Sequence, residues 1–207
     1  MEILRNKIAY LLFIVFNLIL FQSNAQTKVV KAFEDSYNLE YAGKVSQAID
    51  KLKTVYSQDS YEINLRLGWL NYENGLFKES IANYQRAISL MPYSEEAKFG
   101  LILPYIAVGQ WDNVINLYKK ILDNSPNNTI ANYRLGLIYY GKENYQEAYK
   151  YFKKVVDLYP FGYDGLIIFA QTNYKLGKFR EAKVLFNKVL MIYPQDNQAL
   201  EGLSKIK

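Results

Sequence analysis

The chain has 207 residues, 50% of them hydrophobic, which suffices for one domain or one short repeat array with a sizeable core. It contains no histidine and no cysteine, which excludes Ser-His and Cys-His nucleophile pairs, disulfides and ordinary zinc sites. The formal net charge is +5, and the close carboxylate pair Glu95-Glu96 stands where a helix would begin, which acidic side chains favour without a catalytic role. We therefore expect no enzyme, no metal site and no small-molecule cofactor.

The first 25 residues differ from the rest of the chain. Arg5 and Lys7 precede an apolar run of 14 residues from Ile8 to Phe21, and small residues follow up to Ala25. These features are typical of a secretory signal peptide, which would leave Gln26 as the first mature residue. A retained membrane anchor is the alternative, but a span needs about 20 apolar residues. The pattern favours an exported protein, periplasmic or secreted, after cleavage near Ala25.

The basic excess of the chain lies in its last third. Residues 26–141 carry 12 basic and 12 acidic groups, whereas residues 142–207 carry 11 and 7. A nucleic-acid groove would need denser clusters of Lys and Arg on one face, and export also argues against that partner. We expect no nucleic-acid partner, and only weak contact of the basic last third with an anionic surface.

From the second third onward, the chain repeats itself every 34 residues. Four of the five prolines share this spacing: Pro92, Pro126, Pro160 and Pro194. Glycine recurs at Gly75, Gly109 and Gly177, with Glu143 as the exception. Three further columns keep the same register: Phe77, Trp111, Tyr145, Phe179; Tyr84, Tyr118, Phe152, Phe186; and Leu67, Leu101, Leu135, Phe169. Such a fixed period predicts a repeat architecture.

Each repeat is predicted to form two helices. In the fourth repeat, residues are apolar at helical spacing from Ile130 to about Lys142 and from Tyr145 to about Tyr159. A glycine after the first helix and a proline after the second are the usual stop signals. One helix pair cannot bury its apolar faces alone, but stacked pairs share a continuous core.

These residues resemble the tetratricopeptide repeat, a 34-residue helix-turn-helix unit. The resemblance rests on Leu135-Gly136, Ala148, Phe152 and Pro160, and it extends over about residues 29–194. It implies an all-α, right-handed superhelical solenoid of about five repeats plus a C-terminal capping helix. We expect a signal peptide at residues 1–25 and the array at 26–207. Its units lie near 29–60, 61–94, 95–128, 129–162 and 163–196, with a cap at 197–207.

Two repeats depart from the family pattern. The first has Ser36 in place of the small glycine and lacks the terminal proline, as end repeats often do because one side faces solvent. The third has Ile102 and Val114 at the positions of closest helix contact, and Pro104 inside its first helix. A proline there removes a backbone hydrogen bond, so we expect a local bend at this repeat.

The resemblance also implies a binding surface. In this family the first helices of successive repeats form a concave wall that typically binds peptides or partner helices. Carried over to repeat positions 5, 9 and 12, this wall would include Glu40, Ile106 and the following groove candidates: Phe33, Tyr37, Leu65, Trp69, Tyr72, Phe99, Leu103, Tyr133, Leu137, Tyr140, Ile167, Gln171 and Tyr174. Tyrosine and tryptophan are frequent interface anchors, although some of these side chains could instead pack beneath a neighbouring helix.

One subtype of the family is excluded. The carboxylate clamp that grips chaperone tails needs lysine at position 5 and asparagine at position 9, where this chain has Phe33 and Tyr37, then Leu65 and Trp69. We expect a non-enzymatic interaction scaffold in the cell envelope that binds a protein or peptide in an aromatic groove. The alternative is a structural or assembly factor that acts by self-association, and binding of small carbohydrates or lipids is a weaker third possibility.

Overall fold

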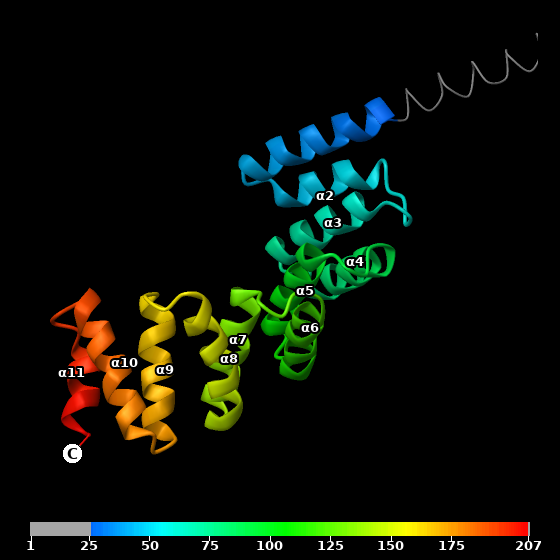
Figure 1. Ribbon diagram of the computed structural model, residues 1–207. Helices are drawn as coiled ribbons and strands as arrows, with labels where there is room; N and C mark the ends of the chain where they lie inside the picture. The colour runs from blue at the N-terminus through cyan, green and yellow to red at the C-terminus, as the bar shows by residue number, and fades with distance from the viewer. Residues whose placement is uncertain (1–25, 207) are drawn as a thin grey trace, which may run out of the picture. The chain divides into compact units, whose positions relative to one another are not determined.

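The computed structural model of the protein describes residues 26–206 (Figure 1). The expected signal peptide lies outside these residues. Helices and turns account for residues 26–206, which confirms the all-α fold for this part of the chain. None of the helices within that range is long and apolar enough to cross a membrane.

The chain forms two compact units, divided between Val108 and Gly109. The first unit begins with a helix over residues 26–41 and continues with α2 (Val45–Lys53), α3 (Tyr61–Glu73), α4 (Phe77–Leu90) and α5 (Glu95–Ala107). The second contains α6 (Trp111–Asn124), α7 (Thr129–Gly141), α8 (Tyr145–Leu158), α9 (Tyr163–Lys175), α10 (Phe179–Ile192) and α11 (Asn197–Ser204). The division therefore falls inside the third repeat, between its two helices.

The first helix of each repeat ends just before a residue with left-handed backbone. Gly75, after α3, has a φ of 74°, and the glycines at 43, 109 and 177 have φ values of 72° to 73°. Glu143, after α7, takes the same conformation with a φ of 57°. The glycine column is thus explained by backbone geometry, and Glu143 adopts that geometry in spite of its side chain.

Polar side chains cap most of the first helices. The residue before the helix accepts a hydrogen bond from the backbone N–H three residues later, as N-caps do. The four pairs are Ser60 with Ile63, Ser94 with Ala97, Asn128 with Ala131, and Asp196 with Ala199. Gly162, before α9, has no side chain to do this.

Two tyrosines link the start of one repeat to the cap of the next. The hydroxyl of Tyr61 lies 2.7 Å from Ser94 Oγ in the first unit, and Tyr163 donates to Asp196 Oδ2 at 2.7 Å in the second. In each pair the two residues are 33 positions apart. Each bond therefore joins neighbouring repeats within one unit.

Small residues allow the two helices of a repeat to approach closely. A Cβ added at Gly136 on α7 would lie 2.5 Å from the ring of Phe152 on α8. In the first unit, Ser80 donates a hydrogen bond of 2.7 Å to the carbonyl oxygen of Gly68. The rings that fill these contacts, Tyr84 and Phe152, are buried. The small and aromatic columns are thus packing residues.

Pro104 lies near the end of α5, which is continuous from Glu95 to Ala107. Its side chain is buried, and its carbonyl accepts a hydrogen bond of 3.1 Å from Val108 N–H. The local bend expected from this proline stays a prediction.

Candidate functional site

In the first unit, seven groove candidates come from the helix over residues 26–41, α3 and α5. We call them the first-unit surface: Phe33, Tyr37, Leu65, Trp69, Tyr72, Phe99 and Leu103. Tyr37 is 54% exposed, and the other six are partly buried. They occupy equivalent repeat positions, so each has one side toward the core and one toward solvent. Phe33 and Trp69, for example, pack against the buried Ile49, Leu67 and their neighbours.

A charged network connects two helices at this surface. Arg66 on α3 donates to Glu40 Oε2 at 2.5 Å, and its guanidinium lies 3.8 Å from the centre of the Tyr37 ring. The indole Nε1 of Trp69 donates to the other carboxylate oxygen of Glu40 at 2.6 Å. Arg66 is buried, so its charge needs this partner. One carboxylate thereby fixes both the arginine and the tryptophan.

The environment of Glu40 sets its pKa. Burial raises the pKa of Glu40, but the hydrogen bonds from Arg66 and Trp69 and the positive charge of Arg66 outweigh this effect. The net result is a pKa below the ordinary value of 4.5. Glu40 is therefore ionised at neutral pH, in the form that both donors require.

The aromatic side chains of α3 form a short chain of ring contacts. The ring centres of Trp69 and Tyr72 are 6.0 Å apart, and Tyr72 is 5.9 Å from Phe77 at the start of α4. The Trp69 ring is thus held by Glu40 at its nitrogen and by Tyr72 at its side. Such a fixed aromatic ring loses little conformational entropy when it binds a partner.

In the second unit, the groove candidates Tyr133, Leu137, Tyr140, Gln171 and Tyr174 are partly buried. We call these five residues the second-unit surface. The sixth groove candidate of this unit, Ile167, is only 7% exposed and belongs to the core cluster. This residue supports the surface from beneath and does not line it, contrary to its predicted place.

Contacts along α7 and α9 hold the second-unit surface. Tyr140 packs edge-on against Tyr145 at 5.2 Å between ring centres, and Tyr174 lies 5.5 Å from Phe179. Gln171 donates to Gln198 at 2.8 Å. Burial raises the pKa of the Tyr140 hydroxyl, so the ring remains neutral at any physiological pH.

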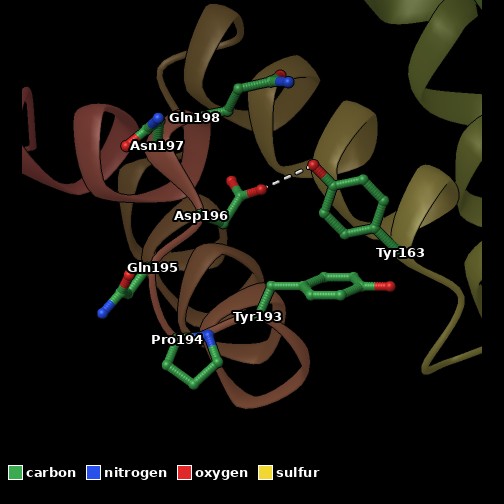
Figure 2. A pocket seen from close by; sticks show the side chains of 7 residues that line it. All are labelled: Tyr163, Tyr193, Pro194, Gln195, Asp196, Asn197 and Gln198. Atoms are coloured by element: carbon green, nitrogen blue, oxygen red, sulfur yellow. Dashed lines mark hydrogen bonds between the residues drawn. The ribbon is translucent and has the colours of Figure 1, made fainter.

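A pocket that the sequence did not reveal lies at the turn between α10 and α11 (Figure 2). Its volume is about 850 Å³, and it is lined by Tyr163, Tyr193 and residues 194–198. The two tyrosine rings meet at 89° with their centres 5.1 Å apart, and the Tyr163 hydroxyl points toward Asp196. The sequence contains one signal for this pocket, a tyrosine that stands 33 residues before a residue whose side chain caps a helix.

Arg66 was not predicted from the sequence either, because repeat position 6 is not a wall position of the family.

Among residues 26–206, no group of three or more His, Cys, Asp or Glu side chains is arranged to hold a metal ion. The side chains described above can pack, stack and donate or accept hydrogen bonds. Their arrangement fits recognition of another molecule.

Two family models match the chain. A tetratricopeptide repeat model matches residues 36–95, and a model described as anaphase-promoting complex, cyclosome, subunit 3 matches residues 107–189. No curated protein matches the chain.

Solved structures of repeat proteins share the fold. A tetratricopeptide repeat protein from Parabacteroides merdae ATCC 43184 aligns with a TM-score of 0.71 at 22% identity, over 87% of this chain and 72% of that one. MamA from Desulfovibrio magneticus RS-1 aligns with a TM-score of 0.66 at 19% identity, over 82% and 97%. YrrB, described as a TPR protein with an unusual peptide-binding site, aligns with a TM-score of 0.66 at 14% identity, over 85% of this chain and 92% of that one. The 34-residue period, the two family-model matches and the fold of these solved structures together support a tetratricopeptide repeat protein.

Proposed function

We propose that the protein is a non-enzymatic interaction scaffold of the cell envelope, which binds a peptide or a partner helix on its first-unit and second-unit surfaces. The family and the fold support a role in protein–protein interaction. The site chemistry agrees with that role, because aromatic and aliphatic side chains make up the first-unit surface and most of the second-unit surface. The location in the envelope rests on the first 25 residues alone.

The observation that carries this proposal is the way Trp69 is held. Its ring is only partly buried, and its nitrogen bonds to Glu40, a residue of another helix. A tryptophan that served only the core would be buried more deeply, whereas interface anchors are rigid, amphipathic and partly exposed before binding. Trp69 has the properties of such an anchor.

Site-specific photo-crosslinking in the cell tests the proposal. A photoreactive amino acid replaces Tyr37 or Tyr72 in the first unit, and Tyr140 or Tyr174 in the second. Control variants carry it at Asp50 on α2 and Lys153 on α8, which are exposed on the second helices of their repeats. We expect the surface positions to crosslink to a discrete protein in the envelope fraction and the controls to give none.

Two other results would change this conclusion. Crosslinks only between copies of the chain, together with concentration-dependent oligomers in size-exclusion chromatography, would favour the self-association alternative. Equal crosslinking from surface and control positions would rule out the two surfaces as the binding site. Fractionation and N-terminal sequencing of the same protein test the envelope location, with Gln26 expected as the first residue.

A further inference from the structure

The first-unit surface carries acidic side chains beside its aromatic rings. Repeat positions 2 and 13 adjoin the wall positions on a helix. In the first unit three of these six positions are exposed glutamates, Glu62, Glu73 and Glu96, and the other three are Val30, Tyr41 and Ala107. In the described first unit, we consider the wall positions 5, 9 and 12 together with the adjoining positions 2, 6 and 13. Arg66 is the single cation among them. Its charge is buried and paired with Glu40. The surface therefore presents aromatic rings with uncompensated negative charge.

Glu73 is placed against the preference of its own helix. It is the last residue of α3, where the helix dipole disfavours a carboxylate, and the last turn contains no basic residue. No ion pair within the described part of the chain includes Glu73. Glu62 and Glu96 differ, because each lies in the first turn of a helix, where acidic residues are favoured. Folding alone does not explain the carboxylate at Glu73.

The first unit already contains one example of the contact that such a surface could make. The Arg66 guanidinium lies over the Tyr37 ring and binds the Glu40 carboxylate. On α3, Tyr72 and Glu73 follow Trp69 with the same combination of rings and carboxylate, but no cation of the described chain lies over these rings. Arginine and lysine bind favourably over aromatic faces, more strongly when a carboxylate is close.

We propose that the partner of the first-unit surface is a basic segment, whose lysine or arginine side chain lies over Trp69 or Tyr72 and pairs with Glu73. This inference rests on the proposed function and specifies the chemistry of its partner. Glu62 and Glu96 supply further negative charge for neighbouring basic residues. In the second unit the equivalent positions include Arg134, Asp164 and Lys175, so that unit has no matching acidic surface.

Fluorescence anisotropy with designed probes tests the proposal. The probes are three fluorescein-labelled peptides of one sequence, in which lysines alternating with leucine and phenylalanine are kept, replaced by glutamine, or replaced by glutamate. We expect the lysine peptide to bind at least tenfold tighter than the glutamine peptide, and the glutamate peptide not to bind. Affinity for the lysine peptide should fall as salt is raised.

Matched variants distinguish the effect of charge at the first-unit surface from the effect of net charge. Glu62→Gln with Glu73→Gln removes two charges from this surface and should weaken binding of the lysine peptide at least fivefold. Asp50→Asn with Glu79→Gln removes two charges from exposed positions on α2 and α4 and should leave its affinity unchanged. Equal losses in the two double variants would mean attraction to net charge, and would overturn the inference. Glu73→Gln alone should keep or raise the melting temperature, since it relieves the unfavourable helix end.

The inference and the proposed function fail in different ways. If the lysine and glutamine peptides bind equally and Trp69→Ala weakens both, the surface binds peptides but the basic partner is wrong. If the lysine peptide does not bind at all, the basic partner is also wrong, whatever the crosslinking experiment finds. If lysine-peptide affinity depends on Glu73 but not on Trp69 or Tyr72, the aromatic contact is wrong and the proposed anchor role fails with it.

Discussion

Trp69 and Glu40 lie on different helices, 29 residues apart in sequence, and are joined by a hydrogen bond of 2.6 Å between the indole nitrogen and one carboxylate oxygen. The other carboxylate oxygen holds Arg66. Orientation of the tryptophan at the first-unit surface therefore depends on the charge of a single glutamate.

This dependence predicts a pH response. The pKa of Glu40 is lowered in the folded protein, so its stabilising contribution is fully present above the unfolded value of about 4.5 and is lost as pH falls through the folded pKa. In a Trp111→Phe background, Trp69 is the sole tryptophan. We expect its fluorescence emission to shift below pH 4.5 while the helical circular dichroism persists.

Glu40→Gln is the control for this experiment. The glutamine cannot change its charge, so the emission of Trp69 should no longer respond to acid over the same range. An identical acid shift in both proteins would assign the response to other carboxylates.

A second prediction separates binding from stability at the aromatic positions. Trp69→Ala and Tyr140→Ala should each weaken partner binding by about 2 kcal/mol or more, as truncation of a central anchor does. Melting temperature and partner affinity are measured for each variant. A large fall in melting temperature, with unchanged affinity per folded molecule, would show that these rings belong to the core.

A third prediction concerns Glu143, the one residue other than glycine with left-handed backbone among those described. A side chain in this conformation costs about 1–2 kcal/mol, so Glu143→Gly should raise the free energy of unfolding by an amount of that order. The opposite kind of substitution at another left-handed position, Gly75→Ala, should lower the free energy of unfolding. Urea denaturation measures both, and a destabilised Glu143→Gly would indicate an interaction of that side chain that outweighs the strain.

A fourth prediction compares two glycines of α7. Gly136→Ala would place a Cβ 2.5 Å from the Phe152 ring, which should destabilise the protein by about 1–3 kcal/mol. Gly141→Ala meets no atom within 4 Å and should be neutral or stabilising, by up to about 1 kcal/mol. Equal effects of the two changes would contradict the close approach of α7 and α8.

A fifth prediction tests the proline of α5. Pro104→Ala restores a backbone donor that can bond to the carbonyl of Gly100, and mid-helix proline costs about 3 kcal/mol, so stability should rise in spite of some lost packing. Partner affinity is measured beside stability. A stability gain with unchanged affinity would mean that the expected bend has no role in binding.

The repeat architecture could be predicted from sequence because its signals are local. Pro160 stops a helix, and Gly75 permits left-handed backbone, whatever surrounds them. The surface was harder to predict, because exposure depends on neighbours from other repeats. Ile167 and Tyr133 share one repeat position, yet the first is buried and the second is partly exposed. The bond from Trp69 to Glu40 joins two repeats, and no single repeat encodes it.

The tyrosine links between repeats have a consequence for how the protein opens. Asp196 caps α11 with one oxygen and holds Tyr163 of α9 with the other, so fraying at the start of α11 also breaks a contact of the preceding repeat. The two repeats should therefore unfold locally together, because the stability of a repeat array includes the interactions between adjacent repeats. Hydrogen exchange of the Ala199 amide, which Asp196 caps, should therefore be slowed to nearly the same degree as in α9, and the short terminal helix would open together with its neighbour.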